Sequence, residues 1–181
     1  MKILASVLTI AASVVLLPAG LAQMSGSTAK KPMLSPPAKA SVELSGKQVT
    51  IDYNTPFMRG RKIMGGLVPY GKVWRTGANP ATTLKTAVNL KIGTATVPAG
   101  TYTLYTLPSE TTWKLIINKQ TGQWGTVYHE SEDLARVDMK KDTLPKRQEQ
   151  MSISFENTHG KKTQLHVRWD TTDVWVPVVA Q

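Results

Sequence analysis

A long basic segment is the part of the sequence with the clearest potential for chemistry. Residues 56–82 read PFMRGRKIMGGLVPYGKVWRTGANPAT and contain no acidic residue. Arginine presents a planar fork of N–H donors that matches a carboxylate or a phosphate, and glycine lets the backbone approach a ligand closely. We therefore predict that Arg59, Arg61, Lys62 and Arg75 contact an anionic ligand.

A structural role for these cations is the alternative that the sequence leaves open. Arg61 or Arg75 could be buried against a strand carboxylate, such as Asp52 or Glu156, and so pin the segment to the body of the domain. The two interpretations differ in whether the guanidinium groups face an open pocket or a buried carboxylate.

Three aromatic residues and an amide accompany the cations. Trp74 and Tyr70, with Trp124 further along the chain, could offer an apolar face to a sugar ring or another ligand. Aromatic side chains more often anchor a loop by burying about 150–250 Å² each. Asn79 lies in a turn before Pro80, where its side chain could bond the local backbone or a ligand.

A histidine stands out in a second irregular segment, residues 119–133. His129 follows Tyr128 and precedes Glu130, so its imidazole has an aromatic and a carboxylate as neighbours. Such a side chain could act as a general base or contact a ligand, because its pKa lies near neutrality. It could equally be exposed or packed against Tyr128.

The familiar catalytic and cofactor motifs are missing. The chain has no G-x-S-x-G elbow, P-loop or dinucleotide glycine pattern, so no catalytic residue is assigned and no cofactor is expected. His129, His159 and His166 lack the spacing of zinc ligands, so no metal site is expected either. His159 falls in a predicted turn and His166 on a predicted outward strand face, which favours surface roles for both.

The N-terminus has the features of a secretory signal. The apolar run 3–17 follows Lys2, and small residues precede a predicted cleavage between Ala22 and Gln23. We therefore expect a signal peptide at residues 1–22, a flexible linker at 23–39 and a folded domain at 40–181. The mature protein would be exported to the periplasm or the cell exterior, with no transmembrane span after cleavage.

Composition narrows the possible partners. The chain has 22 Lys and Arg against 12 Asp and Glu, a formal net charge of +10, and no cysteine. Stability must therefore come from packing, without disulfides. The charge favours an anionic small molecule or a polysaccharide, and nucleic acid is not expected outside the cytoplasm. The sequence does not specify an oligomeric state.

From Ala40 onward the pattern is that of short strands joined by turns. Residues 48–53 alternate between apolar and polar, and Gly46-Lys47 and residues 158–161 read as hairpin turns. Residues 134–139 and 151–156 read as further strands separated by the polar stretch 140–150, and 133–141 is also a weak helical candidate. The sequence predicts an all-β fold: a single antiparallel β-sandwich or flattened barrel of about nine strands, carrying a long glycine-rich basic loop.

The chain also carries a family resemblance over about residues 40 to 179. The matching segments are Gly60–Ile63, Gly66–Gly71, Val73–Asn79, Pro98–Tyr102, Leu104–Pro108, Gln123–Gly125, Ile153–Glu156 and Trp169. With these it resembles the domain of unknown function 2911 family of exported bacterial proteins. The resemblance implies export and a compact β-rich domain, but no activity. Pro80 replaces a more common acidic residue, and Met64 replaces a usual aromatic one.

Three classes of function remain open. The first is a non-catalytic binding module, in which segments 56–82 and 119–133 converge at one end of the sandwich around an anionic or sugar-like ligand. The second is a structural or protein-interaction role, which would show as an exposed apolar patch beside the basic segment. The third is a hydrolase or lyase using His129 or a strand carboxylate with an arginine.

Overall fold

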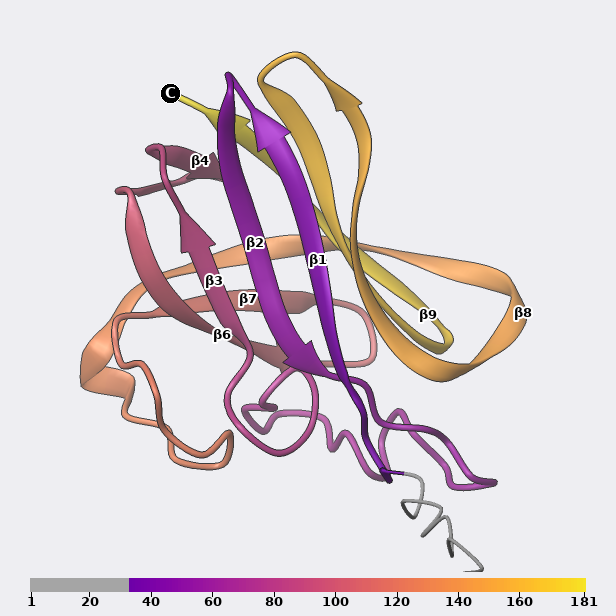
Figure 1. Ribbon diagram of the computed structural model, residues 1–181. Helices are drawn as coiled ribbons and strands as arrows, with labels where there is room; N and C mark the ends of the chain where they lie inside the picture. The colour runs from indigo at the N-terminus through magenta and orange to yellow at the C-terminus, as the bar shows by residue number, and fades with distance from the viewer. Residues whose placement is uncertain (1–32) are drawn as a thin grey trace, which may run out of the picture. The chain divides into compact units, whose positions relative to one another are not determined.

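The computed structural model describes residues 33–181, which form one all-β domain (Figure 1). The expected signal peptide, and the expected linker up to residue 32, lie outside the described residues. Strand β1 begins at Pro37, slightly before the point where the strand pattern becomes clear in the sequence. Within residues 33–181, no helix is long and apolar enough to cross a membrane.

Nine strands form one antiparallel sheet with the order β1-β2-β3-β6-β7-β8-β9-β4-β5. The sheet does not close into a barrel, so β1 and β5 remain its edges. The strands are β1 (Pro37–Leu44), β2 (Lys47–Asn54), β3 (Thr83–Thr86), β4 (Leu90–Ile92), β5 (Ala95–Val97), β6 (Gly100–Pro108), β7 (Trp113–Asn118), β8 (Asp133–His159) and β9 (Lys162–Ala180).

The two longest strands fold the sheet back over itself. The first part of β8 pairs with β7, while later parts pair with β9 from Lys140↔Trp175 to His159↔Lys162. The pairing shifts register on both sides of Gln148, and Asp170 of β9 has a positive φ of 56°. Irregularities of this kind bend a strand, and Figure 1 shows the β8–β9 ribbon turning back on itself at the right of the domain.

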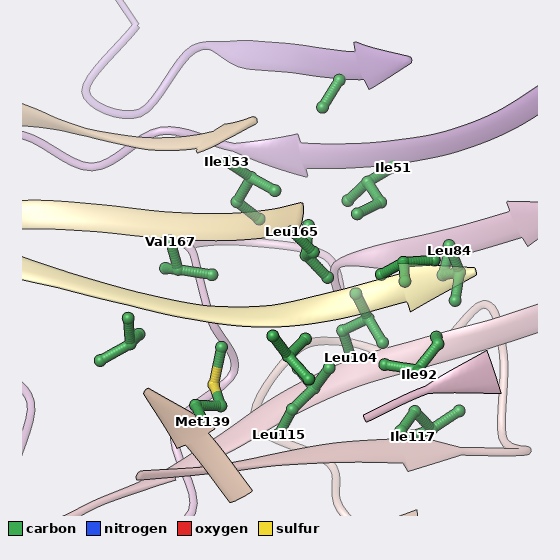
Figure 2. Close-up of a cluster of buried hydrophobic side chains, with 14 of the residues drawn as sticks. Ile51, Leu84, Ile92, Leu104, Leu115, Ile117, Met139, Ile153, Leu165 and Val167 are labelled. Carbon is green, nitrogen blue, oxygen red and sulfur yellow. The ribbon is translucent and has the colours of Figure 1, made fainter. Parts of the chain in front are cut away.

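The folded sheet encloses one apolar core (Figure 2). In β2, Val49 and Ile51 are fully buried, because alternate residues of a strand point to the same face. Core side chains from β2, β3, β4, β6, β7, β8 and β9 converge between the layers: Ile51, Leu84, Ile92, Leu104, Leu115, Ile117, Met139, Ile153, Leu165 and Val167.

The predicted fold class is confirmed, with differences in where strands begin and end. The hairpin of β4 and β5 was not predicted, because each strand has only three residues and gives almost no periodic signal. Residues 134–139, read as a strand from the sequence, lie in strand β8 paired with β7. The weak helical alternative over 133–141 is therefore wrong. The polar stretch 140–150, expected to separate two strands, lies within β8.

His166 is also placed differently from the prediction. It is 5 % exposed, and its Nδ1 lies 2.9 Å from Oδ1 of Asp173. The Nε of Arg168 donates to Oδ2 of Asp173 over 2.8 Å, and its Nη2 donates to Oε2 of Glu156 over 2.8 Å. The bend in β9 brings these residues together. Strand alternation alone places His166 outside and cannot show this contact.

This ion network gives the protein a specific acid sensitivity. Partial burial would raise the pKa of Glu156, but hydrogen bonds from Arg168 and Ser154 outweigh that effect and hold the pKa below its usual 4.5. A lowered carboxyl pKa stabilises the fold fully above the pKa of the unfolded chain. This stability is lost as the pH falls through the lower, folded-state pKa.

We therefore expect Glu156→Gln to lower the free energy of unfolding at pH 7 by about 1–2 kcal/mol. The variant should also show a shallower loss of stability than the wild type as the pH falls below about 4.5, measured by urea unfolding. Asp138→Asn is the matched control, because Asp138 is 79 % exposed in its pair with Lys114 and should change stability by less than about 0.5 kcal/mol. If the free energy of unfolding fell in parallel for Glu156→Gln and the wild type as the pH decreased, Glu156 would not be a source of the acid sensitivity.

Candidate functional site: a basic cavity between two loops

The two irregular segments of the sequence meet in space. We call residues 56–82 the basic loop and residues 119–133 the second loop; Figure 1 shows both at the lower end of the domain. The amide of Gly125 donates to the Asn79 carbonyl over 3.0 Å, and the amide of Ala81 donates to the Gln123 carbonyl over 3.2 Å. These hydrogen bonds, with a bridge between Pro80 and Trp124, form a backbone seam between the loops.

Backbone pairing also holds the basic loop to the sheet. Trp74 exchanges two hydrogen bonds with Thr106 of β6, at 2.8 and 2.9 Å. Near the start of the loop, the amide of Met58 donates to the Glu149 carbonyl of β8 over 2.8 Å. The loop is thus paired at both its ends. No ion pair involves it within residues 33–181.

Trp74 is the apolar anchor of the basic loop. Its side chain is 9 % exposed, stacks on Trp169 at a ring distance of 5.9 Å and meets Trp113 edge-on at 6.3 Å. This arrangement matches the anchoring alternative for Trp74. The Trp169 ring covers one face of the Trp74 indole, so that face is not free to stack on a ligand.

The loop holds three non-glycine residues in the left-handed region. Arg59, Thr76 and Asn79 have φ of 50°, 51° and 60°. This conformation is unfavourable for a β-branched residue such as Thr76, and it persists only where surrounding contacts enforce it. The carbonyl of Thr76 accepts a 2.8 Å hydrogen bond from Oγ1 of Thr82. The conformation of the residues flanking Arg75 is therefore fixed by the fold.

A cavity of about 510 Å³ opens between the two loops. This is within the range of small-molecule sites, about 300–1,000 Å³. Among residues 33–181, no Asp, Glu, His or Lys side chain contributes to its wall. The residues that line it are Leu34, Ser35, Pro56, Arg59, Arg61, Leu67, Pro69, Val73, Trp74, Arg75, Gly77, Ala78, Asn79, Tyr105, Gly125, Thr126, Tyr128 and Trp169.

The guanidinium groups of the cavity arginines hydrogen-bond only to backbone carbonyls among residues 33–181. Arg61 donates from Nε to Met58 O over 3.0 Å and from Nη2 to Phe57 O over 2.7 Å. These two bonds fix the plane of the guanidinium group and leave both hydrogens of Nη1 without a partner in the described chain. A preoriented guanidinium with free donors suits a carboxylate or phosphate oxygen.

Arg75 is positioned by the second loop. Its Nε donates to Gly77 O over 3.3 Å, and its aliphatic stem crosses Gly125. A Cβ at Gly125 would lie 2.8 Å from Cδ of Arg75 and 2.8 Å from the Asn79 carbonyl oxygen, closer than real Cβ contacts. The absence of a side chain at Gly125 therefore makes room for both the arginine and the seam.

Arg59, like Arg61, is exposed, whereas Arg75 is partly buried. Its Nη2 donates to Leu34 O over 3.1 Å, and its guanidinium carbon lies 5.8 Å from the centre of the Phe57 ring. Its backbone amide, not its side chain, donates to Oε1 of Glu149 over 2.8 Å. All three arginines thus keep guanidinium donors available beside one cavity.

The predicted pairing of an arginine with a strand carboxylate is wrong. Asp52 pairs with Lys39 at 2.9 Å and with Lys85 at 3.1 Å, and Glu156 pairs with Arg168. These hydrogen bonds from the two lysines, outweighing burial, hold the pKa of Asp52 below its usual value. The strand carboxylates are therefore occupied by cations from the sheet.

Four of the nine predicted site residues do not line the cavity. Lys62 is exposed, and the partly buried Tyr70 ring lies over Gly65. Trp124 is 53 % exposed on the seam. His129 is exposed, and its backbone carbonyl accepts a hydrogen bond from Nδ2 of Asn118. The five residues that do line it are Arg59, Arg61, Trp74, Arg75 and Asn79.

Two tyrosines of the wall were not predicted as site residues. Tyr105 donates to Val127 O over 2.6 Å, and Tyr128 donates to Oδ2 of Asp133 over 2.6 Å. Burial raises the pKa of both phenols, that of Tyr128 to about 12 with help from Asp133, so both stay protonated near neutral pH. Their strand and loop positions gave no sequence signal, because only tertiary packing turns them toward the basic loop.

Comparison with known protein families shows which family the chain belongs to. The family model described as "Protein of unknown function (DUF2911)" matches residues 35–178. The protein therefore belongs to that family, and the match covers both loops and all the strands except the last two residues of β9. Searches of curated proteins and of solved structures gave no match.

The two tryptophans of the site should differ sharply in their effect on stability. Trp74→Ala should lower the free energy of unfolding by about 3–5 kcal/mol, because it removes a ring packed between two others. Trp124→Ala should change it by less than about 0.5 kcal/mol, because that ring is largely exposed. Urea unfolding of both variants tests this difference. Equal losses would show that Trp74 is not the anchor.

Proposed function

We propose that the protein is an exported, non-catalytic binding protein whose cavity holds a ligand with a carboxylate or phosphate group. The observation that supports this most directly is the set of three arginines beside one cavity with no carboxylate among the described lining residues. The three positive charges repel one another, and no carboxylate in the described part of the wall offsets this repulsion. A bound anion would offset it. The N-terminal signal pattern supports export.

An anion fits the cavity better than a neutral sugar does. Sugar hydroxyls need many acceptors, whereas the part of this wall that the structure describes has no acidic side chain and a single carboxamide, that of Asn79. One face of Trp74 is covered by Trp169, and the rings of Tyr105 and Tyr128 pack edge-to-face at 4.9 Å. The cavity therefore favours charge recognition over ring stacking.

Binding is also better supported than hydrolysis. A general base must lie within hydrogen-bond reach of the reacting group. The described wall offers only two phenols as titratable acids, and the pKa of each is raised. His129, the candidate base, is not among the lining residues.

A thermal-shift screen with acetate, butanoate, succinate, inorganic phosphate and sulfate tests this proposal. A ligand at about 100 times its Kd should stabilise the protein by about 2.7 kcal/mol, which raises Tm by several degrees. Arg61→Gln and Arg75→Gln should each weaken binding about 10- to 100-fold, because each removes charge-assisted hydrogen bonds. Added salt should weaken binding to the wild type.

Lys91→Gln is the control for loss of one positive charge. Lys91 is exposed on β4 and does not line the cavity, so this variant should bind as the wild type does. Gly125→Ala should weaken binding without changing the net charge, because it displaces Arg75. Absence of stabilisation by every anion at low salt would reject the proposed function.

A further inference from the structure

The exposed apolar side chains of the domain gather at one place. Leu34 is 65 % exposed and Leu67 44 %, and both line the cavity. Trp124 is 53 % exposed and Val127 42 %, and they flank the lining residues Gly125 and Thr126. We call Leu34, Leu67, Trp124 and Val127 the rim.

The rim is unusual within this protein. Among residues 33–181, Met33 is the one other strongly exposed large apolar side chain, and it adjoins Leu34. Scattered exposed apolar residues are ordinary, but here two of them line the cavity and two adjoin lining residues in the chain, and such a grouping is typical of a contact surface. The rim therefore extends the cavity outward as an apolar surface.

Positively charged and apolar side chains lie next to each other at this site. The cavity holds the guanidinium groups, and the rim is mostly aliphatic. We propose that the ligand is a single-chain anionic amphiphile, with its carboxylate or phosphate on Arg61 and Arg75 and its hydrocarbon chain across the rim. This inference rests on the proposed function and specifies the ligand class of the same site.

The amphiphile accounts for the rim better than a protein partner does. A cavity of about 510 Å³ admits a slender group, and the arginines inside it require that this group be charged. A hydrocarbon chain attached to such a group reaches the rim directly. Burial of each methylene there increases affinity about fourfold.

A chain-length series is the decisive experiment. Isothermal titration with butanoate, hexanoate, octanoate and decanoate, each below its critical micelle concentration, should show affinity rising about fourfold per methylene. Octyl phosphate and octanoate distinguish a phosphate from a carboxylate headgroup. Octanol, which has the chain without the charge, should bind at least 10-fold more weakly than octanoate.

Matched variants separate the two ends of the ligand. The double variant Trp124→Ser, Val127→Ser changes rim residues that do not line the cavity, so it should make the dependence on chain length shallower while leaving butanoate affinity within about twofold. Arg61→Gln with Arg75→Gln should weaken all chain lengths by a similar factor. Lys91→Gln should change neither property.

The outcomes distinguish this inference from the proposed function. Arginine-dependent binding that does not vary with chain length would overturn the amphiphile and leave the anion site standing. Equal binding of octanol and octanoate would overturn the anionic headgroup. No binding of any anion, short or long, would reject both proposals. A chain-length slope unchanged by the rim double variant would also overturn the inference, because the chain would then lie elsewhere.

Discussion

Backbone pairing of the basic loop is the constraint on which the rest of the site depends. The loop joins the sheet through Trp74 and Thr106 and joins the second loop through Asn79 and Gly125. Buried backbone groups must find hydrogen-bond partners, and here other backbone groups supply them. The loop therefore needs no side-chain ion pair to hold it, and its arginines remain available at the cavity.

The carboxylates that could have neutralised these arginines are occupied elsewhere. Asp52 pairs with lysines of β1 and β3, and Glu156 belongs to the folded-back ribbon of β8 and β9. The charged groups of the sheet and those of the basic loop therefore have different roles. Acid–base pairs stabilise the sheet, while the cations of the loop stay uncompensated within the described chain. Such a charge distribution favours recognition of an anion over stability alone.

The sequence predicted some parts of this arrangement because their signal is local. Alternation in residues 48–53 placed one face of β2 in the core, and the charge pattern of the basic loop directed attention to Arg59, Arg61 and Arg75. It failed for β4 and β5, which are too short to show a period, and for the polar stretch 140–150, which continues strand β8 instead of separating two strands.

The sequence by itself determined the all-β class, the family and the segment that carries the cations, because residue type, periodicity and motif are properties of the chain. Tertiary structure decided how those cations are used. Whether Arg61 meets a carboxylate or a carbonyl, whether His166 faces solvent or Asp173, and whether Tyr128 joins the cavity all depend on contacts between distant segments. Such contacts are fixed by packing and by bends in long strands, which no local pattern encodes.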